Sequence, residues 1–65
     1  MSIGETVKGS PAYLHGRLWK TQITITRIGW REFNVCKHYD RRPVVGAPWQ
    51  YVKSTCYQVA RNPHF

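Results

Sequence analysis

Acidic residues are almost absent from this sequence. Its 65 residues hold three of them, Glu5, Glu32 and Asp40, against ten lysines and arginines, which gives a net charge of +7. Long apolar runs are also missing and the mean hydropathy is -0.52, so we expect no membrane-spanning segment. Hydrophobic residues make up 42% and aromatic residues 14%, which is too much for a disordered chain. The composition therefore indicates one small folded domain whose excess charge suits a polyanionic partner.

Cysteine is scarce, and the sequence begins without the basic and apolar stretch of a secretory signal. We therefore expect a cytoplasmic protein, in the host cytoplasm if a phage encodes it, with Cys36 and Cys56 reduced and partly buried. A disulfide between them is the alternative. With His38 and His64 they form one possible zinc set, but they lack the paired spacing of structural zinc sites. We expect neither a metal nor a cofactor.

Alternation of apolar and polar residues predicts three strands. Residues 18–28 are rich in β-branched side chains and close to period two, and residues 31–39 alternate again after Gly29. Residues 49–60 form a third strand, either continuous or split near Ser54. Three residues that break helices and central strands, Pro43, Gly46 and Pro48, make residues 40–48 a loop.

The register of the first hairpin follows from parity, because a slip of one residue moves every side chain to the other face. A two-residue turn at residues 29–30 would set Ile25 beside Asn34 and split the apolar set. A loop of three or five residues pairs odd positions with odd positions. This brings Ile23 and Ile25 alongside Phe33 and Val35, so we expect the longer loop.

No segment shows a helical apolar pattern, so the predicted fold is mainly β. We expect a small antiparallel meander of three to four strands, or a partly open barrel. Residues 1–16 carry Gly, Ser and Pro, and their Glu5 and Lys8 cancel, so we read them as a flexible N-terminal arm. Residues 17–65 then form the single small β domain that carries the whole excess of +7.

Basic and aromatic residues are interleaved along the predicted strands, most densely from Lys37 to Arg42. Cations can bind phosphates and aromatic rings can stack on bases, so this mixture is typical of surfaces that bind single-stranded nucleic acid. The candidate nucleic-acid or partner-binding residues are Arg27, Trp30, Arg31, Lys37, His38, Arg41, Arg42, Trp49 and Lys53.

A structural role competes with this interpretation, because aromatic rings supply much of the core of a short chain. We expect Trp19 and Phe33 to be core, and Trp49 to pack rather than to line a site. Trp30 lies at the hairpin turn, where little sheet can cover it, and is the ring best placed for a partner. The charge could also serve solubility alone.

The predicted function is a basic, non-enzymatic module that binds single-stranded DNA or RNA, or the machinery that handles them. The first alternative is a phage-type regulator that docks on an acidic surface of a host protein such as RNA polymerase. The second is a small metal-independent ribonuclease with His38 or His15 as the base and Arg41 or Arg42 on the phosphate. We expect a monomer or a weak homodimer and no membrane partner.

One stretch has a family resemblance. Trp49-Gln50-Tyr51-Val52, followed by Tyr57-x-Val59-x-Arg61, is similar to the C-terminal part of the small T7-type phage inhibitors of bacterial RNA polymerase. Those inhibitors are acidic and carry a helix between the second and third strands, whereas this chain is basic and has prolines there. The resemblance suggests obstruction of a polymerase but does not establish membership.

Overall fold

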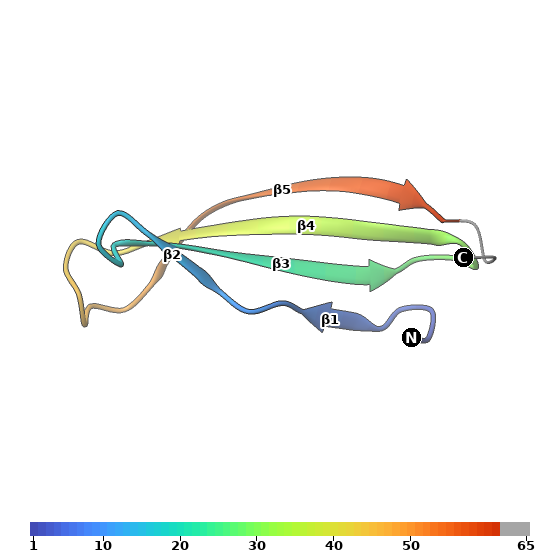
Figure 1. The fold of residues 1–65 in the computed structure, drawn as a ribbon, viewed down its shortest axis with the longest axis horizontal. Coiled ribbons are helices and arrows are strands. Elements are labelled where there is room, and N and C mark those ends of the chain that lie inside the picture. Colours follow the sequence, from blue (N-terminus) through green and yellow to red (C-terminus); the bar gives the residue numbers. More distant parts are fainter. Residues whose placement is uncertain (62–65) are drawn as a thin grey trace.

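The structure is a computed structural model that describes residues 1–61. Its five strands form one antiparallel sheet in the order β1-β3-β4-β5, and β2 pairs with the same edge of β3 as β1 does (Figure 1). The sheet is open and does not close into a barrel, which confirms the predicted mainly-β class. In chain order the strands are β1 (Thr6–Lys8), β2 (Ala12–Leu14), β3 (Trp19–Arg27), β4 (Glu32–Arg41) and β5 (Gln50–Ala60).

The β3–β4 hairpin has the predicted parity. Ile25 lies opposite Val35, and the Ile28 N–H donates to the Glu32 carbonyl at 3.0 Å, which leaves residues 29–31 as the loop. Odd positions therefore face odd positions, as the apolar pattern requires. One cross-strand neighbour differs from the prediction: Ile23 lies opposite Lys37 and not beside Phe33.

Strand β5 is continuous through Ser54 and pairs with β4 along its length. The register shifts between Tyr39 and Asp40, which face Lys53 and Tyr51, so Val52 is the extra residue of a β-bulge. Strand β4 runs on to Arg41, and the proline-containing loop is accordingly shorter than predicted. No helix of the described chain is long and apolar enough to cross a membrane.

The N-terminal stretch, predicted as an arm, supplies two short strands. Val7 pairs with Ile25, and Leu14 pairs with Trp19. The turn from β2 to β3 holds three consecutive residues with positive φ at 15–17, two of them not glycine, and the Leu18 N–H closes it on the His15 carbonyl at 3.2 Å. Three-residue strands are too short to show a period of two, so sequence alternation did not find them. That residues 1–16 are mobile stays a prediction.

The two cysteines form a disulfide, so the expectation that both are reduced is wrong. Cys36 on β4 lies directly opposite Cys56 on β5, with the two Cα atoms 4.1 Å apart. The position of Cys56 depends on the β4–β5 register and on the bulge at Val52, neither of which the sequence revealed. The lack of a secretory signal alone therefore could not decide whether the two cysteines are bonded.

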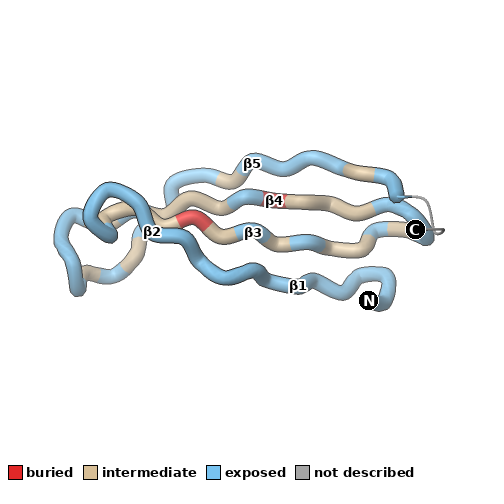
Figure 2. Tube along the Cα trace, viewed as in Figure 1, coloured by how far each residue is buried: buried red, intermediate tan, exposed pale blue. Residues whose placement is uncertain are grey.

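A single layer of strands leaves this fold almost without a core. Among the described residues only Cys36 and Thr21 are buried (Figure 2). Trp19 and Phe33, expected to be core, are only half-buried because residues 1–61 form no second layer over the sheet. The molecule measures 45 × 20 × 17 Å, so the single sheet is elongated, and we call it the slab.

The two faces of the slab have different chemistry, as the register shows. One face, called the apolar face from here on, carries an uncharged cluster over β1, β3, β4 and β5. The opposite, polar face carries threonines, amides, the disulfide and His38, whose ring nitrogens lie 2.8 Å from Thr24 Oγ1 and 2.7 Å from Ser54 Oγ. The residues of the apolar cluster are Val7, Ile23, Ile25, Phe33, Val35, Tyr57 and Val59.

Candidate nucleic-acid interface

The predicted site residues fall into separate places rather than one patch. Arg27, Trp30 and Arg31 lie at or beside the β3–β4 turn, at one end of the slab. A second set lies at or near the opposite end, where β3 begins and β4 ends, and His38 lies on the polar face between β3 and β5. The residues of this second set are Arg41, Arg42 and Trp49, with Lys37 and Lys53 further along the sheet.

Trp49 is the centre of the second set. The guanidinium carbon of Arg42 lies 4.1 Å from the centre of a Trp49 ring, and Lys20 Nζ lies 4.8 Å from it. The centre of the Tyr13 ring lies 6.1 Å from the centre of the Trp49 ring, and the guanidinium carbon of Arg17 lies 5.6 Å from the centre of the Tyr13 ring. Each cation gains about 0.5–1 kcal/mol from such a ring at an exposed site. Trp49 is half-buried and contacts the Tyr13 ring, and two cations lie over its own ring.

We call this region the basic end. It comprises Arg17, Lys20, Arg41 and Arg42 together with the rings of Tyr13 and Trp49.

Arg41 and Arg42 line a hollow at the basic end, together with Pro43 and Gln50. The backbone fixes Arg42, because its N–H donates to the Leu18 carbonyl at 2.9 Å and its Nε donates to the Arg17 carbonyl at 2.9 Å. As consecutive positions they extend toward opposite faces of the sheet, Arg41 on the side of Tyr39 and Arg42 over Trp49. A guanidinium group beside such a hollow suits a phosphate.

The one carboxylate close to the basic end is already engaged. Asp40 Oδ2 lies 3.7 Å from Lys20 Nζ, and this is the single ion pair within residues 1–61. Arg41 and Arg42 have no acidic partner in that part of the chain. Their charge is available to an anion from outside.

Tyr39 lies two positions before Arg41 on β4, on the same side of the sheet as the apolar cluster. Lys37 Nζ and Lys53 Nζ lie 5.5 Å and 5.2 Å from the centre of its ring. Tyr39 also lines a shallow hollow with Trp19 and Leu14. A ring flanked by two lysines can offer stacking to a base and charge to the neighbouring phosphates.

At the other end of the slab, Arg27 forms hydrogen bonds with backbone carbonyls of the protein itself. Arg27 donates from Nη1 to the Met1 carbonyl at 2.6 Å, from Nη2 to the Trp30 carbonyl at 2.9 Å and from Nε to the Gly29 carbonyl at 3.1 Å. The guanidinium therefore closes the β3–β4 turn against the N-terminus. Trp30, predicted as the hardest ring to cover, is 71% exposed.

Sequence reasoning missed three members of the basic end: Tyr13, Arg17 and Lys20. Tyr13 and Arg17 belong to the stretch predicted as an arm or border it, and Lys20 looked like one cation of a strand. Only the pairing of β2 with β3 brings Tyr13 beside Lys20. Arg17 lies in the turn with a positive φ of 67°, and no local sequence motif predicts this conformation.

Metal ligands do not gather within the described part of the chain, where no group of three or more His, Cys, Asp or Glu side chains could hold an ion. The zinc set considered from the sequence loses two thiolates to the disulfide. Its fourth member, His64, lies outside the described residues.

Comparisons with models of protein families, with curated proteins and with solved structures found no match for this chain. The resemblance to polymerase inhibitors gains no support from the fold either. The segment between β4 and β5, where those proteins carry a helix, contains turns and bends only.

Proposed function

We propose that this protein is a small non-enzymatic module that binds single-stranded nucleic acid through its basic end. The observation that carries the proposal is the pair Arg41 and Arg42, which line one hollow and have no acidic partner within residues 1–61. A phosphate in that hollow would accept charge-assisted hydrogen bonds from an arginine that lines it, and the second arginine adds positive charge nearby. Its binding would also release counterions from the nucleic acid.

Tyr39 supports the same function from the neighbouring position. It precedes Arg41 by two residues on β4, a distance of about 7 Å along a strand. This is close to the length of one extended nucleotide, so a base could stack on Tyr39 while its phosphate lies near Arg41. Lys37 and Lys53 on either side of the ring would then meet the flanking phosphates.

The deciding experiment replaces both arginines. Arg41→Ala with Arg42→Ala is expected to weaken binding to a labelled single-stranded oligonucleotide at least tenfold. The slope of log K against log salt should also become shallower, by about 0.7 for each phosphate of the single strand that the variant no longer binds. Fluorescence anisotropy over a salt series measures both quantities.

Lys8→Glu is the matched control. It lowers the net charge by two, as the double variant does, but Lys8 lies on β1 opposite Thr24, on the polar face and away from the basic end. The control should retain most of the wild-type affinity. Equal weakening by both variants would show that net charge alone drives binding, and wild-type protein that fails to bind at low salt would remove the proposal.

The alternative partner is an acidic protein surface, as expected for a regulator of RNA polymerase or of another host assembly. Exposed Trp30 favours this reading, because aromatic anchors carry much of the energy of protein interfaces. A pull-down from bacterial lysate, with and without nuclease, separates the two. Recovery of a specific protein after nuclease treatment supports the regulator, and loss of all partners supports the nucleic-acid module.

The proposal includes a cytoplasmic site of action, in a host cell if the gene belongs to a phage. Disulfides are rare in the cytoplasm, so binding through the basic end should not depend on the Cys36–Cys56 bond. Cys36 is five positions along β4 from Arg41, roughly 17 Å at strand spacing. The basic end should therefore bind nucleic acid in either redox state, provided that the sheet stays folded.

A further inference from the structure

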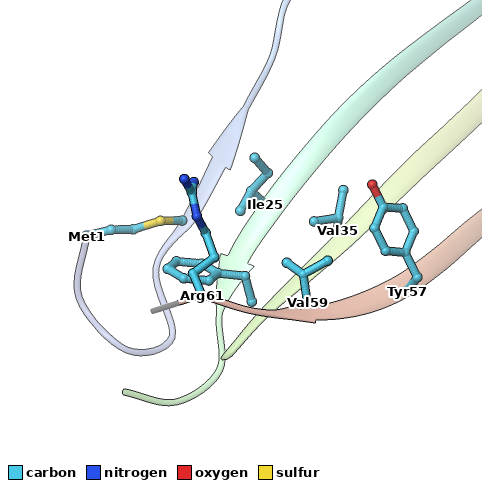
Figure 3. A pocket seen from close by; sticks show the side chains of 7 residues that line it. Met1, Ile25, Val35, Tyr57, Val59 and Arg61 are labelled. Carbon is cyan, nitrogen blue, oxygen red and sulfur yellow. The ribbon is translucent and has the colours of Figure 1, made fainter. Parts of the chain in front are cut away.

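The two sulfur atoms of the Cys36–Cys56 disulfide lie in different surroundings. The bond crosses from β4 to β5 on the polar face, because the chain neighbours Val35 and Tyr57 lie on the apolar face, where Figure 3 shows them. Cys36 is buried, with 9% of its surface exposed, whereas Cys56 is exposed. A thiolate can attack either sulfur of a disulfide, and access helps to decide which one reacts.

Neighbouring side chains surround Cys36 on its inner side. Thr24 on β3 lies directly opposite Cys36. Along β4, Asn34 and His38 lie two positions before and after Cys36 on the same face, and Asn34 Nδ2 donates to Cys36 Sγ at 3.4 Å. The His38 ring is held between Thr24 Oγ1 at 2.8 Å and Ser54 Oγ at 2.7 Å. The inner side of Cys36 therefore faces protein side chains.

Cys56 lies on the outermost strand of the sheet. Within residues 1–61, no strand pairs with the outer edge of β5. Displacement at sulfur requires that the incoming thiolate lie in line with the bond that breaks. For Cys56 this line leads past the edge of the sheet into solvent, whereas for Cys36 it leads back over β4 toward Thr24. The fold therefore favours attack on Cys56.

We propose that Cys56 is a site of thiol exchange, where a small anionic thiol such as glutathione forms a mixed disulfide. The incoming thiolate bonds to Cys56 Sγ, and the Cys36–Cys56 bond breaks. Its electron pair leaves with Cys36 Sγ, which then takes a proton from water. The incoming sulfur is oxidised and Cys36 is reduced, so no further oxidant or reductant is needed. Asn34 Nδ2 donates to the sulfur on which the negative charge develops.

Charge and position define the thiol and its effect. The net charge of +7 attracts an anionic thiol more than a neutral or cationic one. The adduct would lie on the polar face, opposite Cys36 and about 17 Å along the sheet from Arg41. This site does not rest on the proposed function, and its occupation should leave nucleic-acid binding at the basic end intact.

The test locates glutathione at early times of the reaction. Oxidised wild-type protein is mixed with reduced glutathione, free thiols are trapped by alkylation, and mass spectrometry measures glutathione on each cysteine. Trypsin separates the two cysteines, because Lys37 and Lys53 lie between them. Glutathione on Cys56 is expected to exceed that on Cys36 about tenfold or more in the folded protein. In urea that unfolds the chain, the ratio should fall close to one.

Two threonines of β3 provide a matched pair of variants. Thr24→Ala clears part of the in-line path to Cys36, so the preference for Cys56 should fall by about threefold or more. Thr26 lies on the same face but opposite Asn34, so Thr26→Ala should keep the wild-type ratio. Circular dichroism checks that both variants fold.

Three results would overturn the proposal: equal attachment to the two cysteines in folded wild-type protein, preference for Cys36, or no mixed disulfide at all. The comparison of folded and unfolded wild-type protein needs no variant, so the test holds even if Thr24→Ala fails to fold.

Discussion

Loss of the Cys36–Cys56 disulfide is expected to lower the free energy of unfolding by about 3 kcal/mol, the loop-closure value for cysteines separated by 20 residues. The bond constrains the unfolded chain, and in the folded sheet it ties β5 to β4 near the middle of their pairing. Within residues 1–61, strand β5 pairs with β4 alone, so no other strand of that range holds it. Urea unfolding at one fixed protein concentration, with and without a reductant, measures the loss.

The control for this prediction is the double variant Cys36→Ala with Cys56→Ala. It should unfold at the lower urea concentration of the reduced wild type and should not respond to the reductant. A single-cysteine variant is less suitable because the remaining thiol can form bonds between chains. Equal midpoints for oxidised and reduced wild-type protein would show that the bond adds nothing to stability.

Strands β3 and β4 were predictable because apolar and polar side chains come close to alternating along them. Residues 18–28 and 31–39 gave β3 and β4 almost to the residue, and parity alone chose the odd-to-odd register of their hairpin. That argument works because a slip of one position moves a whole apolar set into water. It needs several alternations, so it could not detect β1 or β2, whose three residues each depend on pairing with β3.

The core and the site were harder to predict, for a related reason. The alternation placed the apolar residues of the hairpin on one face but could not show that the sheet is a single layer, which leaves Trp19 and Phe33 half-buried. It identified Arg41, Arg42 and Trp49 as neighbours in the chain. The basic end also contains Tyr13, Arg17 and Lys20, which come from the predicted arm and the segment just after it. Only the pairing of β2 with β3 places these three residues beside Trp49.

Trp49→Ala is expected to destabilise the fold by about 2 kcal/mol, less than the 3–5 kcal/mol of a fully buried ring because Trp49 is half-buried. Its removal takes away the surface on which Arg42 and Lys20 lie and the contact with Tyr13. These contacts hold the β4–β5 loop and β2 against the basic end. Chemical unfolding monitored by circular dichroism measures the change.

Trp30→Ala is the matched control, since it removes the same side chain from a position that is 71% exposed. A change within about 0.5 kcal/mol is expected there. The two tryptophans also separate stability from binding. Folded Trp49→Ala protein should bind single-stranded nucleic acid more weakly, because Arg42 loses the ring beneath it, whereas Trp30→Ala should keep the wild-type affinity. The opposite pattern would place the nucleic-acid contact at the β3–β4 turn instead of the basic end.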